Sequence, residues 1–569
     1  MFSSLKAFIS RRILNRGVDA RRFWNGEPIA SPKANVPLFG GLNKKAFTLT
    51  YEKESRDCVW LSPGEKVEIK IHGEKKLRVK LSFACNGKPK ISEGVGVYVG
   101  DKKVVDLKYI VSKKWHNVGI EHGGSIKIIN TSASKLAVAH PVVAEKYVRD
   151  EKNFTPKNII VILLDSLTRD SIGPFNPEMA EFTPNITRFF EKSVKYSNCF
   201  SQSEWTLPSI YSLLTSRYPL GHGMLDLKGN ARNDNHLVED NLPQRMRELG
   251  YSTFAYSTIK VFHPAFYAHV GFDRFIYDQF PQPRQTHADL CAAAITQLHA
   301  NSDSRNFMFL HFLDTHEPWS NTNELDDLML SNFRITDPFE EYNFYKRGYK
   351  DGKAEPIFDE TGIEVLTERR NARLANVDLS LQALFDYLEK SGQLEDTVVA
   401  LFSDHGCLYT AQNQPLLCES RTNVPLLILH PKYKGGTHAE LVATNLDIGS
   451  TLLSIAGGDP KLGDGVANAP FAEDSAGRSY VISESIFGDL YKVALRDENY
   501  VYHYSCSYDK NKKVVDIGGV GKSSLFARKN ENLCVDLSGK HPDAVKKMHD
   551  LLLYHLKKYG FDPTIKGNS

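Results

Sequence analysis

The 569-residue sequence lacks the features that mark membrane-spanning, secreted, zinc-ribbon and nucleic-acid-binding proteins. Its eight cysteines show no CxxC pair and no disulfide-framework spacing, so we expect reduced thiols in a reducing compartment. No run of about 18 apolar residues is present, and Lys6, Arg11 and Arg12 interrupt the apolar residues of the N-terminus, so we expect neither a membrane span nor a secretion signal. The 71 basic and 68 acidic side chains give a net charge of +3, which provides no argument for a nucleic-acid partner.

A chain of this length exceeds one ordinary hydrophobic core, so we expect at least two domains. Residues 1–30 place Leu5, Phe8, Ile9 and Ile13 at helical spacing among basic side chains. This pattern fits a basic amphipathic helix on an anionic membrane surface, with a helix packed on its own protein or a frayed terminus as the alternative.

Residues 31–150 contain short runs that alternate polar and apolar side chains between glycine, asparagine and lysine turns, for example KVEIKIHG, LRVKLSFAC and SIKIINTS. Alternation with a period of two predicts an antiparallel β-sandwich domain. Its role could be carbohydrate binding or plain structural support.

From residue 155 to residue 569 the pattern changes to strands that alternate with helices. Residues 158–165, NIIVILLD, form a continuous apolar run, as expected for a strand buried on both faces of a parallel sheet. Three helix-to-strand units follow, two of them with a glycine at the end of the helix, which predicts an α/β fold with a mostly parallel central sheet. The irregular residues 321–362 are expected to form an excursion over that sheet.

Three apolar strands of this second domain end in residues that could hold a metal ion or an anion. The first ends at Asp165, the second at Asp314 and His316, and the third at Asp404 and His405. Any one of these could be a helix cap or turn residue, but ligands of open parallel sheets bind beyond the carboxyl ends of the strands. We therefore expect these side chains to converge.

Two carboxylates and an imidazole suit a divalent cation, Mn²⁺ or Zn²⁺ and less well Mg²⁺. A hydroxyl could complete the shell, and Thr206 in SEWTLPSIYSLL is the candidate. Pro208 lies just inside the start of a predicted helix, so Thr206 or Leu207 occupies the capping region, where amide donors and the helix dipole favour an anion. An ordinary N-cap remains the alternative for Thr206.

The motifs of this domain resemble the sulfatase branch of the alkaline phosphatase superfamily over about residues 158–559, in matching order. The motifs concerned are TPNITRFFEKSVKYSNCFSQSEWTLPSIYSLLTSRYPLGHGM, GYSTFAYST before GFD, DTHEPW, SDHG, RTNVPLLILHP and ENLCVDLSGKHPDAVKK. The resemblance implies a sulfatase-like α/β sandwich. Sulfatases carry Cys or Ser at the first position of a C/S-x-P-x-R motif, where it is oxidised to formylglycine.

This sequence departs from that motif at two positions, Thr206 and Ile210. Oxidation of a threonine would give a ketone, so we expect Thr206 to remain an alcohol. Family members that keep threonine resemble phosphoethanolamine and phosphoglycerol transferases, which form a phosphothreonine intermediate. The resemblance then implies a single metal held by Asp165, Thr206, Asp404 and His405.

The resemblance also points to further residues around the nucleophile. His316 could protonate the leaving group or activate the acceptor, with a structural histidine as the alternative. Lys260 and His263 lie near where sulfatases place an anion-binding Lys-x-His pair, but one residue further apart. The remaining substrate-binding candidates are Asp314, which might support a second metal with His316, Trp319 of DTHEPW, and Arg421, for which a surface ion pair is the alternative.

These observations favour a metal-dependent transferase that moves a substituted phosphoryl group onto a glycan or lipid acceptor. The donor would be a phosphodiester or an activated nucleotide, and the enzyme would be cytoplasmic, with peripheral contact to the inner face of the membrane through residues 1–30. Three alternatives remain open: a phosphodiesterase or phosphatase that uses water, a non-catalytic glycan-binding protein, and a sulfatase, which Thr206 disfavours.

Overall fold

The structure is a computed structural model. It describes residues 29–30 and 47–561, with gaps at 72–77, 86–93, 109, 122–123, 145, 226–239, 260, 278–286, 317–318, 320–359, 408–414, 434, 473–476, 488–489, 510–513, 517–521 and 534. The predicted N-terminal helix, Lys260 and nearly all of the 321–362 excursion lie outside the described residues. Within the described part of the chain, none of the helices combines the length and the apolar character that crossing a membrane requires.

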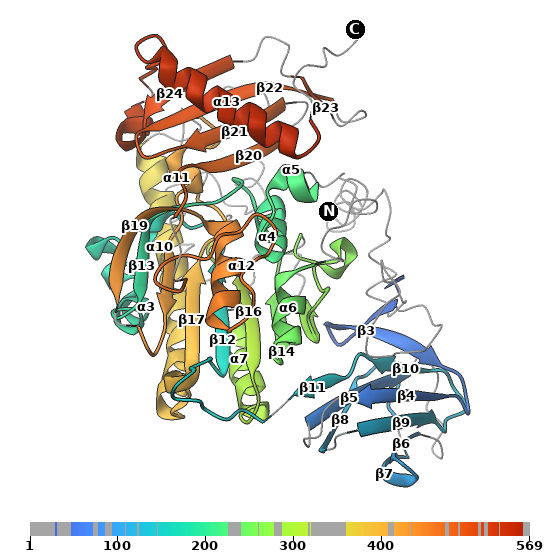
Figure 1. The fold of residues 1–569 in the computed structure, drawn as a ribbon. Coiled ribbons are helices and arrows are strands. Elements are labelled where there is room, and N and C mark those ends of the chain that lie inside the picture. Colours follow the sequence, from blue (N-terminus) through green and yellow to red (C-terminus); the bar gives the residue numbers. More distant parts are fainter. Residues whose placement is uncertain are drawn as a thin grey trace, which may run out of the picture. The chain divides into compact units, whose positions relative to one another are not determined.

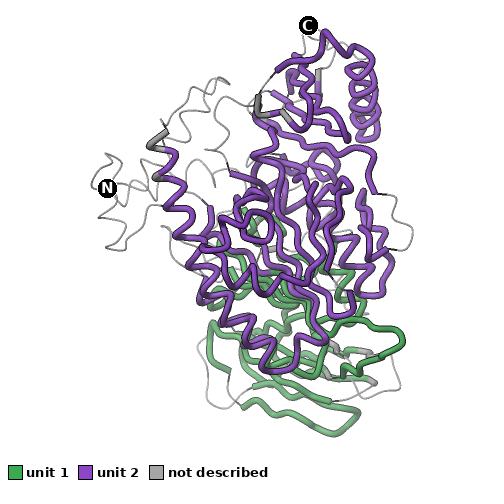
Figure 2. The backbone as a smooth tube through the Cα atoms, turned by 90° about the vertical axis from the view of Figure 1, so that its left-hand side faces the viewer, with its two compact units in different colours: residues 1–158, 237–279, 298–309 green, residues 159–236, 280–297, 310–569 purple. Residues whose placement is uncertain are grey.

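The chain divides into two compact units, and neither is continuous in sequence (Figure 2). Unit 1 takes residues 1–158, 237–279 and 298–309, and unit 2 takes residues 159–236, 280–297 and 310–569. The unit that contains the predicted sandwich therefore also includes segments from further along the chain. Helix α7 and strand β16 have residues in both units.

Unit 1 is built mainly from antiparallel strands. Its elements are β1 (Ile29–Ala30), β2 (Phe47–Tyr51), β3 (Glu54–Leu61), β4 (Lys66–Ile71), β5 (Arg78–Cys85), β6 (Val95–Val99), β7 (Lys102–Leu107), β8 (His116–Glu121), β9 (Gly124–Asn130), β10 (Leu136–Ala139), β11 (Val142–Ala144), α6 (Leu242–Glu248), β14 (Ser252–Ser257), η5 (Pro264–Phe266) and β15 (Arg274–Tyr277).

Two sheets of unit 1 enclose a shared apolar core, which confirms the predicted antiparallel sandwich. One sheet has the strand order β4-β9-β6-β7, and the other includes β11-β5-β10-β3. Alternate side chains of β3, β4, β5, β6, β9 and β10 are buried together in one cluster, as the period-two pattern requires. Strand β3 also pairs with β15, which runs parallel to β14.

Unit 2 alternates strands with helices. Its elements are β12 (Asn158–Leu164), η2 (Arg169–Ser171), η3 (Pro177–Glu181), α3 (Pro184–Phe189), β13 (Val194–Phe200), α4 (Thr206–Thr215), α5 (Pro219–His222), α7 (His287–Ala300), β16 (Asn306–Phe312), α10 (Glu360–Lys390), η6 (Gln393–Asp396), β17 (Thr397–Phe402), α11 (Glu419–Thr422), β18 (Leu426–Leu429), β19 (Gly436–Ala443), α12 (Thr444–Ile455), β20 (Val481–Phe487), β21 (Leu490–Arg496), β22 (Tyr500–Asp509), β23 (Val514–Asp516), β24 (Lys522–Ala527), η8 (Arg528–Leu533) and α13 (Pro542–Lys558).

The central sheet of unit 2 has the strand order β16-β12-β17-β18-β13-β19 (Figure 1). Every residue of β12, β16 and β17 is buried, which explains their continuous apolar sequences. Strand β13 runs parallel to β19, whereas β18 runs antiparallel to both β17 and β13, so the sheet is mixed. Helix α4 packs against α12, and α3 packs against α10.

A second sheet of unit 2 consists of β20-β21-β22-β23 with β24 beside β22, and these neighbouring strands run antiparallel. Helix α13 lies across this sheet (Figure 1) and buries Met548, Leu552 and Leu556 against it. The amphipathic spacing of these three residues, at i, i+4 and i+8, explains why one face of the helix is covered.

The order of the central strands brings three chain segments to one edge of the sheet. Strand β12 lies between β16 and β17, so the residues that follow these three strands are neighbours. The amide of Asp165 donates to the carbonyl of Phe312 at 3.0 Å, and the amide of Leu167 donates to Ser403 Oγ at 2.9 Å. The convergence predicted from the strand ends therefore has a direct structural basis.

Candidate active site

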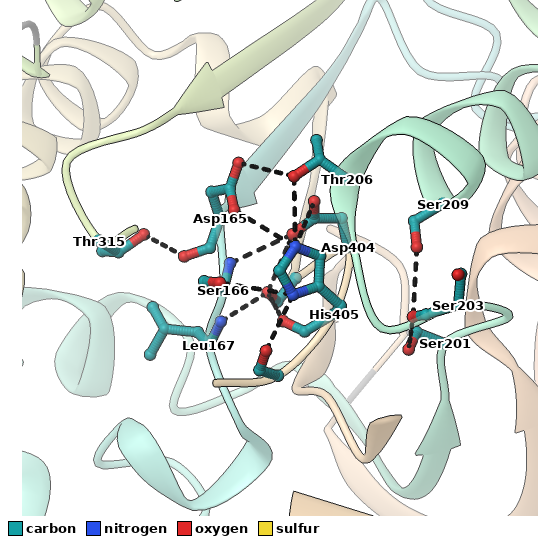
Figure 3. A network of polar contacts seen from close by, with 12 residues as sticks. Asp165, Ser166, Leu167, Ser201, Ser203, Thr206, Ser209, Thr315, Asp404 and His405 are labelled. Atoms are coloured by element: carbon teal, nitrogen blue, oxygen red, sulfur yellow. Dashed lines mark hydrogen bonds and ion pairs between the residues drawn. The ribbon is translucent and has the colours of Figure 1, made fainter. Parts of the chain in front are cut away.

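Thr206 is the first residue of helix α4, and its hydroxyl faces the residues at the sheet edge. Trp205, with extended backbone angles, is the N-cap, so Thr206 lies one position inside the helix and the cap is the residue before it. Thr206 Oγ1 lies 3.2 Å from His405 Nε2 and 3.5 Å from Asp165 Oδ2 (Figure 3). Only 3% of Thr206 is exposed, so its hydroxyl belongs to a buried polar cluster.

Asp404 and His405 complete this cluster on the third strand. His405 Nε2 lies 3.4 Å from Asp404 Oδ2 and 3.7 Å from Asp165 Oδ1. His405 Nδ1 lies 2.8 Å from the carbonyl of Gly406, and because a carbonyl can only accept, Nδ1 carries the proton. Nε2 therefore presents its lone pair to Thr206 and the two carboxylates.

The backbone around Asp165 is shaped to hold these groups. Ser166 has a left-handed conformation with φ 62°, which is uncommon for a residue other than glycine. Its amide donates to Asp404 Oδ1 at 3.2 Å, and Thr315 Oγ1 donates to the carbonyl of Asp165 at 2.6 Å (Figure 3). The turn after β12 thus connects the first and third strand ends directly.

The two buried carboxylates have opposite pKa shifts. Burial raises the pKa of Asp165, but the nearby His316, His311 and His405 outweigh it, so the net pKa is lowered. Burial raises the pKa of Asp404, and the negative charge of Asp165 raises it further. Two adjacent buried carboxylates are therefore costly to ionise together without a compensating cation.

The cluster fits the divalent cation that the sequence predicts. Asp165 Oδ1 and Asp404 Oδ2 are buried and accept no hydrogen bond from any residue that the structure describes. Ligand atoms of Asp165, His316 and His405 lie within 4.8 Å of one another. With Asp404 and Thr206 Oγ1 beside them, Asp165 and His405 supply the mixed oxygen and nitrogen set that Mn²⁺ or Zn²⁺ prefers.

Asp314 does not join His316 in this group. The amide of His316 donates to the carbonyl of Leu313 at 2.9 Å, so the chain turns there. Asp314 Oδ1 instead lies 4.0 Å from His287 Nε2. His316 is half-buried and its ring centroid is 6.3 Å from that of His405.

The other substrate-binding candidates have different surroundings. Trp319 is 1% exposed, and its indole donates to the carbonyl of Thr315 at 2.9 Å, so it braces the turn beside Asp165. His263 belongs to unit 1, packs edge-on against Tyr277, and has its pKa lowered to about 3 by burial and by the charge of a neighbouring histidine.

Arg421 is buried, which rules out the surface ion pair that the sequence left open for it. Its carbonyl accepts a hydrogen bond from the amide of Gly406 at 2.6 Å. A Cβ added to Gly406 would lie 2.4 Å from the carbonyl oxygen of Ser420 and 2.9 Å from Arg421 Cα. Glycine is therefore required where the segment after His405 approaches helix α11.

The sequence analysis missed His311 and Asn445. His311 on β16 is fully buried, and its Nε2 donates to Asp165 Oδ2 at 2.9 Å. Asn445 Nδ2 donates to the carbonyl of Asp404 at 3.1 Å. The backbone amide of Asn445 donates to Gln202 Oε1 in the loop before Thr206. A histidine within the apolar run NFMFLHF was the one available signal, because a buried imidazole needs a partner.

Comparison with known proteins agrees with the resemblance. A family profile described as Sulfatase matches residues 157–458. The ulvan-active sulfatase of Formosa agariphila is 24% identical over 52% of this chain and 52% of its own length. The mouse iduronate 2-sulfatase is 30% identical over 25% of this chain and 26% of its own length. The chain thus spans between a quarter and about half of these relatives.

Solved structures show the same fold. The phosphonate monoester hydrolase of Silicibacter pomeroyi aligns with a TM-score of 0.51 and 16% identity, covering 72% of this chain and 96% of its own. A Bacteroides fragilis protein described with the sulfatases aligns with a TM-score of 0.54 and 14% identity, covering 73% and 98%. The names of these relatives favour the sulfatase alternative over the transferase interpretation.

Proposed function

Since the chain belongs to the sulfatase family, we propose that it is a metal-dependent hydrolase of anionic esters in which the Thr206 hydroxyl is the nucleophile and phosphorus esters are the substrates. The observation that supports this most directly is the position of Thr206 Oγ1, 3.2 Å from His405 Nε2 and 3.5 Å from Asp165 Oδ2 at the start of α4.

Thr206 is suited to attack as an alcohol. Its β-carbon bears a methyl group, so oxidation there would give a ketone and not the aldehyde that serves sulfatases. Ile210 is 1% exposed and occupies the position of the motif's arginine, so that cation is also missing from the motif. Nucleophilic attack at phosphorus needs only a deprotonated hydroxyl held in line with the leaving group.

Different side chains bind the cation, attack phosphorus and donate a proton in the first step. Asp165, Asp404, His405 and Thr206 would hold the cation, which when bound would lower the pKa of the Thr206 hydroxyl and neutralise charge on the ester. The Thr206 hydroxyl releases its proton to solvent and its oxygen forms a bond to phosphorus, while the bond from phosphorus to the leaving oxygen breaks and the leaving oxygen takes the electron pair. His316 donates a proton to the departing alcohol. The first amides of α4 face the equatorial oxygens.

In the second step water attacks the phosphorus of phosphothreonine, the bond to Thr206 Oγ1 breaks with its electron pair going to Oγ1, and Oγ1 takes up a proton from solvent. His316, now deprotonated, accepts the proton of the attacking water. Replacing water by a glycan or lipid hydroxyl would make the same site a transferase, with a phosphodiester or nucleotide-activated donor. That interpretation shares the first step, and the hydrolase is preferred because the similar proteins are named as hydrolases.

Sulfate ester hydrolysis is the second candidate, and the names of the curated relatives favour it. In this case the Thr206 oxygen would attack sulfur without prior oxidation. The same cation site and His316 would serve, so the two candidates differ in the ester that the enzyme accepts.

A substrate panel separates the candidates. Nitrophenyl phosphate, bis-nitrophenyl phosphate, a nitrophenyl phosphonate and nitrophenyl sulfate are each tested with chelator and with Mn²⁺ or Zn²⁺ restored. We expect metal-dependent cleavage of phosphorus esters that Thr206→Ala abolishes and Thr206→Ser retains in part. Preferential cleavage of the sulfate would contradict the proposed substrate class, and activity in Thr206→Ala would contradict the proposed nucleophile.

A further inference from the structure

The loop before Thr206 is held by a strand of the second sheet of unit 2. Ser483 Oγ donates to the carbonyl of Ser201 at 2.6 Å, and the amide of Glu484 donates to the carbonyl of Gln202 at 2.8 Å. Ser485, the next residue of β20, donates its hydroxyl to Glu204 Oε1. Strand β20 is therefore fixed against the loop, and its Ser485 end lies at Glu204, two residues before the nucleophile.

Lys492 lies on the same face of this sheet as Ser485. Strands β20 and β21 are antiparallel, and Lys492 is the residue directly opposite Ser485. Side chains of directly opposite residues leave the same face of a sheet, so the Lys492 side chain projects toward Glu204. Lys492 is half-buried, and its side chain forms no hydrogen bond or ion pair with any residue in the described part of the chain.

Arg421 is a second cation in the same region. Burial lowers the pKa of Lys492, the negative charge of Glu204 raises it, and the positive charge of Arg421 lowers it. Arg421 also acts on Glu204, whose pKa burial raises. The backbone of Arg421 is tied to Gly406, the residue after His405.

The carboxylate whose charge acts on Lys492 is that of Glu204, two residues before the nucleophile. Glu204 is 6% exposed and is oriented by the hydroxyls of Ser203, at 3.1 Å, and Ser485. A purely structural ion-pair network would pair each half-buried cation with a carboxylate. Lys492 is instead half-buried, opposite the serine that binds Glu204 in the loop before Thr206.

We propose that Lys492, with Arg421 behind it, forms a subsite for a second anionic group of the substrate, a carboxylate, sulfate or phosphate separate from the ester that is cleaved. This inference rests on the proposed function, because it assigns the substrate a second negative charge near Thr206. Glu204 holds the subsite in place and limits its positive charge. The enzyme would then favour polyanionic substrates over esters with a neutral leaving group.

The test uses direct binding to the metal-loaded full chain and needs no turnover. Ethylphosphonate and 3-phosphonopropionate differ by one carboxylate, and calorimetry gives the dissociation constant of each. We expect 3-phosphonopropionate to bind more tightly to the wild type, and Lys492→Met to remove about tenfold of that preference, the loss of one charged hydrogen bond. Lys492→Arg should restore it.

Two further variants control for structural effects. Glu204→Gln removes the opposing negative charge and should increase the preference for 3-phosphonopropionate over ethylphosphonate. This change is opposite in direction to the one expected for Lys492→Met. Lys195→Met replaces a half-buried lysine at the start of β13 and should leave the preference unchanged.

The proposed subsite would be refuted if the wild type bound the two probes equally. It would also be refuted if Lys195→Met and Lys492→Met reduced the preference for 3-phosphonopropionate by the same factor. Failure of the Thr206 variants to affect hydrolysis would instead overturn the proposed function. The two results are distinguishable because the binding ratio does not depend on turnover.

Discussion

His311 gives the sharpest test of how the site is held. Its Nε2 donates to Asp165 Oδ2 at 2.9 Å, and both residues are fully buried. A hydrogen bond to a charged group contributes about 1.5–3 kcal/mol, which corresponds to about 10- to 150-fold in a binding constant. His311→Leu should therefore weaken binding of Mn²⁺ or Zn²⁺ by about 10- to 100-fold, as is typical of partners that orient metal ligands.

The assay is competition with a chromogenic chelator on purified protein, which measures metal affinity without turnover. His311→Gln keeps an N–H donor near the position of Nε2 and should lose less affinity than His311→Leu. Thermal unfolding of the metal-free variants checks that both remain folded. If His311→Leu binds metal as tightly as the wild type, Asp165 does not depend on His311 for its orientation, and the reasoning from this contact is refuted.

Three more predictions follow from other parts of the molecule. His316→Ala should slow cleavage of esters with alkyl leaving groups by about 100-fold or more. It should affect nitrophenyl esters far less, because nitrophenolate departs without being protonated. Equal losses of rate for both kinds of ester would exclude His316 as the general acid. Gly406→Ala should lower kcat, since the added Cβ would lie 2.9 Å from Arg421 Cα and must displace the segment after His405; an unchanged kcat would show that α11 can move freely. Glu54 has its pKa lowered to about 2: burial raises it, but Arg56 and a second arginine outweigh that effect. Because the folded pKa is the lower one, Glu54 stabilises unit 1 by up to about 3 kcal/mol above the unfolded pKa, and this contribution is lost as the pH falls from about 4.5 toward 2. Urea unfolding of Glu54→Gln should show a weaker pH dependence in that range than the wild type, and parallel curves would contradict it.

The sequence was most informative about the central strands and their ends. Continuous apolar runs identify β12 and β17. A polar residue directly after a buried strand is expected at the edge of the sheet where the carboxyl ends of neighbouring strands lie. This is why Asp165, Asp404 and His405 could be placed together before any geometry was known. Thr206 could be added because Pro208 marked the start of a helix.

Other residues could not be placed from the sequence because their roles depend on which strands are neighbours. His311 reaches Asp165 only because β16 pairs beside β12. His316 lies with Asp165 and His405 whereas Asp314 lies near His287, and strand alternation does not reveal the turn at residues 313–316. Lys492 lies on an ordinary strand far along the chain, and only the β20–β21 register brings it to Glu204.

The central claim is that Thr206 acts as an unmodified alcohol that becomes covalently attached to the substrate's phosphoryl group. Rapid acid quenching of the metal-loaded enzyme during cleavage of a phosphodiester, followed by proteolysis and mass spectrometry, tests it directly. The account predicts a substituted phosphoryl group on Thr206 of the peptide containing SEWTLPSIYSLL and none in the Thr206→Ala protein. An oxidised Thr206, or turnover with the adduct on another residue, would contradict the account.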